Sequence, residues 1–362
     1  MARGVKAAAP GAWPADAWTG TLLVVRLSSL GDVVLTTGPL RCLKQRRPQV
    51  RVELLTRPAY APLLAAAPAI DRVRTTAEPA PLVPGSGEEA RYARVLDWQG
   101  SGRGRRAAQR FAPGVARLGA RRAALRRRLL VWLGPRIVPP ASYVERLAES
   151  FAGRRLERRD LAPELVAPAA GRAAWSAAWP AELAGEPVQV LAPGASKPLK
   201  AIPRELRAAL RSRLARRGPV VEIVSPRAGG SGTPAAGRSP AAGAELQLTR
   251  VGSAHWRVEG GLLAIAGLLE RAAGFIGSDS GLLHMAYALG CPAVGLYGAT
   301  APELGFAPLG TAVSVGVRLP CRPCHVHGPR VCWLGHRRCW REIDPDRVME
   351  ELTGLQQRTD GA

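Results

Sequence analysis

Short apolar runs that alternate with helical patterns are the feature that most constrains the fold of this chain. Strands separated by helices pair in parallel, in a sheet that helices cover on both faces. Because 362 residues exceed the usual size of one domain, the sequence predicts an α/β protein with two domains. Seven runs have the length and apolar content of buried strands: 21–27, 51–56, 94–97, 188–192, 220–224, 274–277 and 293–297.

The segments between these runs predict the helices. A helical pattern follows the first run, and we expect Pro39 to kink it and Pro48 to end it. Residues 225–244 are Gly, Ser, Pro and Ala in low-complexity order, so no structure is predicted there. Further helices are expected at 59–66, 203–217, 259–272, 280–289 and 345–357, the last one capped by Asp344.

The chain is strongly basic, with a formal net charge of +23 at pH 7. Only four of its 51 basic residues are lysine, and a GC-rich genome would also produce such an arginine bias. The distribution is more informative, because residues 98–143 contain eleven Arg and no Asp or Glu. Such a block suits a nucleic acid or an anionic membrane surface as partner. No apolar run is long enough for a membrane span, and no secretory signal is expected.

The first candidate site is the segment 28–32, which directly follows the first predicted strand. Ligands of open parallel sheets bind beyond the carboxyl ends of the strands, so Ser28, Ser29, Gly31 and Asp32 are placed to meet one. The segment lacks the GxGxxG pattern of dinucleotide-binding proteins. Asp32 equally fits a residue that only favours the positive end of a helix dipole.

A second polar loop follows the strand at 188–192. Its Gly-containing turn, with Ser196 and then Lys200, can present backbone N–H groups and an ammonium to a phosphate. Lys200 gains weight because a lysine persists here in a chain that otherwise uses arginine.

A third polar loop joins the strand at 274–277 to the helix at 280–289. Asp279 and Ser280 can cap that helix, and the free N–H groups from Ser280 onward, with Gly281, offer a site for an anion. His284 falls about one turn into the helix, on the adjacent face. A capped helix with an ordinary core histidine is the alternative interpretation.

Four of the six cysteines lie close together near the C-terminus, whereas Cys42 and Cys291 lie in apolar stretches and suit a buried core. The spacing within the cluster can supply a tetrahedral structural zinc site. The alternative is four unligated thiols packed in the domain. The cluster consists of Cys321, Cys324, Cys332 and Cys339.

Taken together, four motifs in order resemble the lipopolysaccharide heptosyltransferases of glycosyltransferase family 9. The motifs are RLSSLGDVVLTTGPLRCLK at 26–44, LDWQG at 96–100, PGASKPLK at 193–200 and SDSGLLHMAYALGCPAVGLYGAT at 278–300. The resemblance implies a GT-B fold, in which two Rossmann-like domains face a central cleft. It implies an acceptor domain over 1–170, a donor domain over 171–345, and a final helix over 346–362 that packs back.

The resemblance also implies a reaction: heptose moves from ADP-heptose to the lipopolysaccharide inner core, with inversion and without a catalytic metal. Asp32 would be the general base, and Lys200 would contact the leaving diphosphate. The implied donor site comprises Ser196, Lys200, Asp279, Ser280, Gly281 and His284. The implied acceptor site comprises Ser28, Ser29, Gly31, Arg121 and Arg122.

The implied partners are an ADP-sugar and an anionic lipid-linked oligosaccharide, and nucleic acid is not expected. The implied location is the cytoplasmic face of the inner membrane, with peripheral contact. The sequence departs from the family after the strand at 220–224, where Ser225-Pro226-Arg227 replaces the usual acidic residue. Two alternatives therefore stay open: a same-fold enzyme with another donor or acceptor, and a non-enzymatic nucleic-acid-binding protein with a zinc module.

Overall fold

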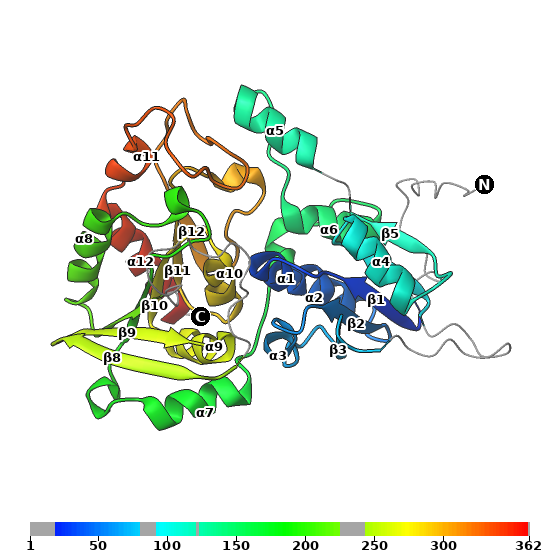
Figure 1. Cartoon of the computed structure of the whole chain (residues 1–362), viewed down its shortest axis with the longest axis horizontal. Helices are drawn as coiled ribbons and strands as arrows, with labels where there is room; N and C mark the ends of the chain where they lie inside the picture. Colours follow the sequence, from blue (N-terminus) through cyan, green and yellow to red (C-terminus); the bar gives the residue numbers. More distant parts are fainter. Residues whose placement is uncertain (1–18, 80–91, 121–122, 225–242, 361–362) are drawn as a thin grey trace.

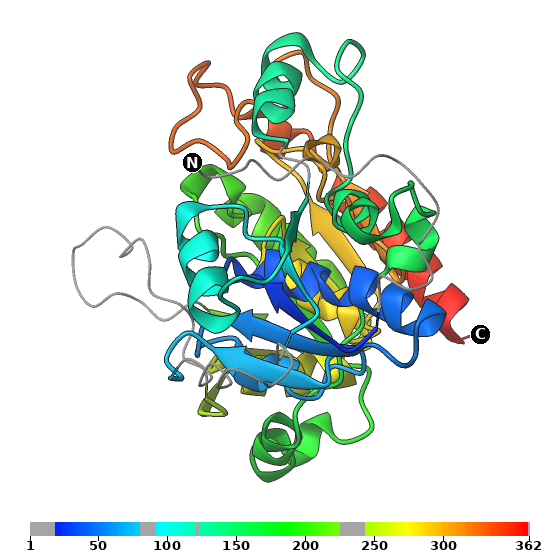
Figure 2. The same ribbon diagram turned by 90° about the vertical axis from the view of Figure 1, so that its right-hand side faces the viewer.

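The chain forms two α/β lobes that lie side by side in a computed structural model, which describes residues 19–79, 92–120, 123–224 and 243–360 (Figure 1). Each lobe is built on one largely parallel sheet with helices packed on it, as the turned view in Figure 2 also shows. The predicted fold class, with two Rossmann-like domains, is confirmed. Most of the low-complexity segment, residues 225–242, lies outside the described residues.

Five parallel strands form the first sheet, in the order β3-β2-β1-β4-β5. The central strand β1 is buried from Leu22 to Val25, which explains its continuous apolar sequence. Val25 lies level with Leu55 and with Asp97 on its two neighbours, so the loops after these strands share one edge. The strands are β1 Thr21–Val25, β2 Arg51–Thr56, β3 Arg72–Thr75, β4 Arg94–Asp97 and β5 Arg117–Gly119.

The helical pattern after β1 is broken into two helices at Thr36, and the second ends at Arg46. Pro39 lies in the first turn of the second helix, where its missing N–H costs no helix hydrogen bond. The interruption near Pro39 and the end before Pro48 are therefore both confirmed. The helices of this lobe are α1 Leu30–Leu35, α2 Thr37–Arg46, α3 Ala61–Leu64, α4 Gly102–Phe111, α5 Ala124–Leu133 and α6 Tyr143–Ala152.

Seven strands form the second sheet, in the order β12-β11-β10-β6-β7-β9-β8, and only the edge pair β8 and β9 is antiparallel. The helix predicted at 259–272 is wrong at its start, because β9 continues to Gly260 and the helix begins at Leu262. The strands are β6 Gln189–Ala192, β7 Val220–Ile223, β8 Leu246–Gly252, β9 His255–Gly260, β10 Gly274–Ser278, β11 Ala293–Leu296 and β12 Ala312–Val315.

The last helix packs onto the second sheet, where Val348, Leu352 and Leu355 are buried in the same cluster as α8. The chain joins the second lobe at α7, whose Gly171 lies against the backbone of Leu263. The helices of this lobe are α7 Ala169–Ala178, α8 Arg204–Leu214, α9 Leu262–Arg271, α10 Gly281–Ala288, α11 Arg338–Arg341 and α12 Pro345–Asp360, with a short 3₁₀ turn, η4, at Pro198–Lys200.

The two lobes share a packed seam. The largest cluster of buried apolar side chains includes Val33 and Tyr143 of the first lobe and Leu283 and Tyr297 of the second. Removing this apolar surface from water stabilises the arrangement of the lobes as well as each lobe. The edges of the two sheets are therefore held in a defined relation, and the loops at those edges can form one site.

Candidate active site

Asp32 lies in the first turn of α1 and is held by the residue that begins that helix. Its Oδ2 accepts hydrogen bonds from the Ser29 backbone N–H at 3.0 Å and from the Ser29 hydroxyl at 2.9 Å. The same oxygen pairs with Arg26 Nη2 at 2.9 Å. Asp32 therefore does lie at a helix N-terminus, where a carboxylate is stabilising, as the structural interpretation expected. All three of these contacts are made to Oδ2.

The segment at 96–100 positions this loop from the neighbouring strand. Gln99 Oε1 accepts hydrogen bonds from the backbone N–H groups of Leu27 and Ser28, at 2.9 and 3.3 Å. The carbonyl of Trp98 accepts a hydrogen bond from Arg26 Nη1 at 2.6 Å. Arg26 is thereby fixed on two sides, and it fixes Asp32 in turn.

Opposing effects act on the charge of Asp32. Burial raises the pKa of the carboxyl, but Arg26 and the two hydrogen bonds from Ser29 outweigh burial, and the pKa lies below its ordinary value. The carboxylate is therefore ionised at neutral pH and able to accept a proton.

Arginine and aromatic side chains surround the carboxylate. The guanidinium groups of Arg26 and Arg146 lie over the ring of Tyr143, at 5.3 and 5.6 Å from its centroid. Arg127 lies over the ring of Phe306, in the other lobe, at 4.6 Å. Burial and the charge of Arg127 lower the pKa of Arg146 to about 10. These arginines form a strongly positive environment beside Asp32, whereas Arg121 and Arg122 lie outside the described residues.

On the second lobe, Lys200 at the end of η4 pairs with Asp279 at the end of β10. The Nζ to Oδ2 distance is 2.9 Å, and Thr300 donates a hydrogen bond to the same Oδ2 at 2.8 Å. The hydroxyl of Ser280, the N-cap of α10, is buried and has no hydrogen-bond partner among the described residues. A buried donor without a partner is costly, so this hydroxyl marks a position where a ligand would be stabilising. Ser196 is exposed on the preceding loop.

His284 lies between Asp32 of the first lobe and the Lys200–Asp279 pair of the second. Its side chain is 4% exposed, and its Nδ1 is 2.8 Å from the hydroxyl of Tyr287. Burial lowers the pKa of His284 to about 4, and the charges of Asp279, Asp32 and Lys200 all act on its ring. The imidazole is therefore neutral at pH 7. The structure thus brings the three predicted loops together around this histidine.

Two glycines make this approach of the lobes possible. A Cβ atom on Gly31 would lie 2.6 Å from Cδ2 of His284, and one on Gly281 would lie 2.9 Å from Cβ of Leu30. Each distance is too short for any residue with a side chain unless its neighbours move. The first turns of α1 and α10 therefore meet directly, and both glycines are needed where they meet.

Comparison with known proteins decides the family. A sequence model described as glycosyltransferase family 9 (heptosyltransferase) matches residues 144–331, more than half of the chain. The protein belongs to glycosyltransferase family 9. The predicted resemblance and the prediction of a glycosyltransferase enzyme are both confirmed. No curated protein matches the sequence significantly.

Solved structures agree with this family 9 assignment. The structure of E. coli ADP-heptose LPS heptosyltransferase II is 20% identical, with a TM-score of 0.63, and the match covers 94% of this chain and 99% of that chain. E. coli heptosyltransferase WaaC with ADP is 16% identical, with a TM-score of 0.57 and coverage of 92% and 99%. The iron-containing glycosyltransferase TibC from enterotoxigenic E. coli is 15% identical, with a TM-score of 0.54 and coverage of 94% and 77%. At such identities the likeness establishes a shared fold.

The cysteine cluster of this family 9 glycosyltransferase lies on the loop between β12 and α11 and at the start of α11. Backbone N–H groups around the turn after Cys332 lower the pKa of its thiol, whereas burial and the neighbouring thiols raise the pKa of Cys324 to about 11. Four thiols suit a soft metal such as zinc. In the described part of the chain, however, no three Cys, His, Asp or Glu side chains converge as metal ligands do. The zinc site stays a prediction.

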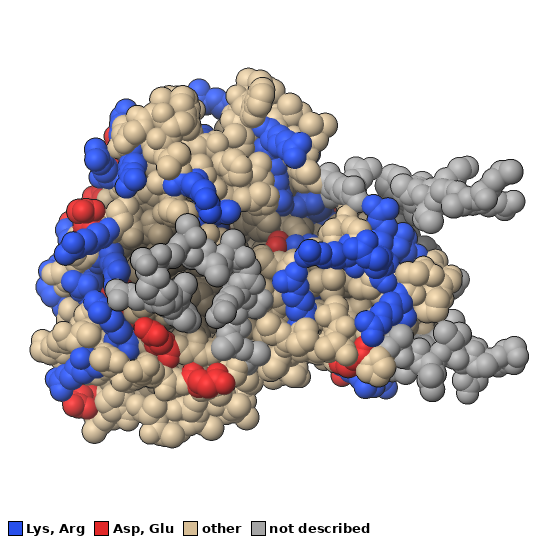
Figure 3. Space-filling view, viewed as in Figure 1, with Lys and Arg blue, Asp and Glu red and all other residues tan. Residues whose placement is uncertain are grey.

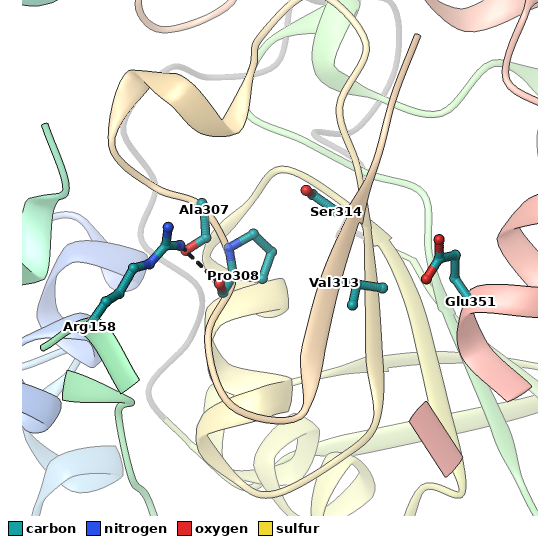
Figure 4. Close-up of a pocket in the computed structure, with 6 residues that line it drawn as sticks. All are labelled: Arg158, Ala307, Pro308, Val313, Ser314 and Glu351. Carbon is teal, nitrogen blue, oxygen red and sulfur yellow. Dashed lines mark hydrogen bonds between the residues drawn. The ribbon is translucent and has the colours of Figure 1, made fainter. Parts of the chain in front are cut away.

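A separate hollow of about 410 Å³ lies between the lobes, lined by residues that include Arg158, Pro308, Ser314 and Glu351 (Figure 4). Arg158 already donates hydrogen bonds to the carbonyls of Ala307 and Pro308, at 2.9 and 3.0 Å. None of its lining residues belongs to a predicted motif, and we assign it no ligand.

Sequence reasoning gave no separate role to Arg26, Gln99 or Tyr143, although Arg26 and Gln99 lie in the motifs at 26–44 and 96–100; Arg127 was predicted only as part of the basic block. Arg26 interrupts an apolar strand pattern, and a charged residue at the end of a buried strand is the signal that points to it. The others act through partners distant in sequence, which spacing does not reveal.

Proposed function

We propose that this glycosyltransferase transfers heptose from ADP-heptose to the inner core of lipopolysaccharide, with inversion at the anomeric carbon and without a catalytic metal. One observation carries the proposal. The ionised carboxylate of Asp32 lies on one lobe, and Lys200 and the Ser280 hydroxyl, which has no partner among the described residues, lie on the other; all three lie around the neutral His284. Transfer of a sugar from a nucleotide needs a base on one side and an anion-stabilising group on the other.

In the proposed reaction the acceptor hydroxyl attacks the anomeric carbon as its proton passes to Oδ1 of Asp32. The bond from the anomeric carbon to the diphosphate oxygen breaks, and ADP leaves with its added negative charge. Lys200, the Ser280 hydroxyl and the N–H groups at the start of α10 receive that charge. Asp279 keeps Lys200 in position, since it pairs with the Nζ at 2.9 Å.

The acceptor is proposed to be an anionic, lipid-linked oligosaccharide. Its phosphates or carboxylates would meet the arginines near Asp32, of which Arg127 and Arg146 are described, with Ser28 and Ser29 contacting the sugar. Arg121 and Arg122 remain proposed acceptor residues. A lipid-linked acceptor also implies that the enzyme works at the cytoplasmic face of the inner membrane.

Thermal unfolding in the presence of nucleotide sugars tests the donor assignment. A ligand that binds the native state raises the melting temperature, so ADP-heptose should protect the protein more than UDP- or GDP-sugars do. Protection by UDP- or GDP-sugars alone would indicate another donor. Absence of protection together with tight, salt-sensitive RNA binding would indicate the nucleic-acid alternative.

A further inference from the structure

Helix α5 exposes large apolar side chains to water, unlike most surface helices. Its inner face is anchored, with Leu130 buried and Arg127 over Phe306. On the outer face, Leu125 is 71% exposed and Trp132 is 86% exposed. Surface helices normally turn their apolar face inward and their polar face to water. The exposed apolar side chains of α5 and the turn after it are Leu125, Leu129, Trp132, Leu133 and Ile137.

The cysteine-rich loop of the other lobe carries a second exposed apolar group. Trp333 is 69% exposed, and Val331 and Leu334 beside it are also exposed. The two groups lie at the same end of the molecule in both ribbon views (Figures 1 and 2). The charge of Arg127 acts on His327 of this loop, which places the two segments near each other.

The charge around these groups is positive. Exposed arginines flank the apolar side chains on both segments, and α5 lies in the block that has no acidic residue. In Figure 3 the end of the molecule that carries α5 shows basic and uncharged atoms. The exposed arginines are Arg126, Arg128, Arg136, Arg330 and Arg337.

We propose that α5 and the cysteine-rich loop form one membrane-docking edge, which inserts its apolar side chains into the interface of an anionic bilayer. Tryptophan favours this interfacial layer, and basic residues beside apolar ones add attraction to anionic lipids. Among the described residues, no helix combines the length and hydrophobicity of a transmembrane span. The inference deepens the proposed membrane contact and rests on that part of the proposed function.

Because both lobes contribute, docking orients the molecule. Arg127 of α5 contacts Phe306 of the other lobe, and its charge acts on Asp32. The docking edge therefore adjoins the acceptor side of the active site. A lipid-linked acceptor could reach Asp32 without leaving the membrane surface.

Vesicle binding of the full chain tests the proposal without turnover. Wild-type protein should co-sediment with phosphatidylcholine vesicles that contain phosphatidylglycerol, and less with phosphatidylcholine alone. The triple variant Leu125→Gln, Leu129→Gln and Trp132→Gln should bind at least about tenfold more weakly, because three apolar side chains no longer insert. Trp333→Gln should weaken binding by a smaller factor. The matched control Val166→Gln with Val251→Gln, at exposed apolar positions elsewhere, should bind as wild type does.

Equal vesicle binding by the triple variant and wild type would overturn the proposal. The proposal would also be overturned if the wild type were a dimer, and the triple variant were a monomer that binds vesicles as well as the wild type does. The apolar face would then be the interface with a second copy of the chain. Brominated lipids supply a measurement that does not rely on the triple variant. They should quench the fluorescence of wild type more than that of Trp132→Phe, which keeps an apolar side chain, and equal quenching would also overturn the proposal. Protection by ADP-heptose tests the donor separately, so the two proposals fail independently.

Discussion

The loop after β1 and the start of α10 face each other across the seam, but the Asp32 carboxylate of the first and the Ser280 hydroxyl of the second differ in the partners that the described residues give them. Asp32 has an ion pair and two hydrogen bonds on one oxygen. The hydroxyl of Ser280 is buried without a partner in the described part of the chain, next to the pair of Lys200 and Asp279. The Asp32 carboxylate is held in place by the protein itself, whereas the Ser280 hydroxyl is left for the partner that we propose the nucleotide supplies. This difference suits a fixed base facing an exchangeable nucleotide.

Asp32→Asn should produce the largest change. General-base catalysis is typically worth about 10²- to 10⁴-fold, so kcat should fall by about that factor while ADP affinity stays unchanged. The free energy of unfolding should fall by about 1–3 kcal/mol, because Arg26 loses its ionic partner. Asp71→Asn is the matched control, since Asp71 also pairs with a cation and a backbone N–H in the same lobe. It should cost stability and leave kcat intact; a similar loss of kcat in both variants would show that Asp32 is only structural.

Lys200→Ala should affect both binding and turnover. A hydrogen bond to a charged group is worth about 1.5–3 kcal/mol, so ADP affinity should fall by roughly 10- to 100-fold, with a further loss in kcat. Isothermal titration with ADP and steady-state kinetics measure the two effects. Lys197→Ala, on the same loop, should change neither. Unaltered ADP affinity in Lys200→Ala would remove Lys200 from the donor site.

Ser280→Ala should separate ligand binding from stability. The hydroxyl has no partner among the residues that the structure describes, so the melting temperature without ligand should not fall. Loss of one hydrogen bond to the nucleotide should weaken ADP binding by about fivefold. Thr300→Val gives the contrast, because Thr300 donates to Asp279 and its removal should lower stability by about 1 kcal/mol. A lower melting temperature with unchanged ADP affinity in Ser280→Ala would mean that the Ser280 hydroxyl faces no ligand.

Removal of the predicted zinc should affect the region around Lys200 and the start of α10, and should leave the region around Asp32 unchanged. We expect one zinc per chain by elemental analysis, lost in Cys321→Ser and kept in the control Cys42→Ala. The cysteine-rich loop packs on Lys200 of the proposed donor site, since a Cβ atom on Gly328 would lie 2.6 Å from Cγ of Lys200. Chelation should therefore lower the melting temperature and weaken ADP binding a few-fold. A metal content near zero, with no response to chelators, would leave the thiols unligated.

Acid should loosen the seam through His284. Burial lowers its pKa to about 4 from the usual 6.5, so folding favours the neutral imidazole. The stability this provides is fully present above about pH 6.5 and is lost as the pH falls toward 4. Thermal unfolding of His284→Gln should show a weaker dependence on pH in this range, whereas the exposed control His325→Gln should match wild type. Identical dependence of the melting temperature on pH in His284→Gln and wild type would show that His284 is not the origin of the acid sensitivity.

The sequence predicts the interior of the fold better than its edges. Buried parallel strands such as β1 and β6 are continuous apolar runs, so composition alone marks them. The edge hairpin of β8 and β9 escaped prediction because β8 is largely exposed and β9 alternates buried and exposed side chains, and Glu259 was assigned to a helix although it lies on a strand. Edge strands carry a weaker pattern, since one face meets water.

The site shows the same division between local and distant information. Asp32, Lys200 and Asp279 lie in the segments that follow β1, β6 and β10, so chain order alone places them near the sheet edges. Arg26 depends on the carbonyl of Trp98, and Arg127 depends on Phe306 in the other lobe. Such contacts arise only when the chain has folded, and no spacing rule contains them.

The anomeric configuration of the product tests the central claim most directly. A base on one lobe and a leaving group held by the other require attack on the face of the sugar opposite the departing ADP. Nuclear magnetic resonance of the product formed from ADP-heptose and a lipid-linked core acceptor should show a single, inverted linkage. A retained configuration, or no heptose transfer by protein that ADP-heptose protects against unfolding, would contradict the account.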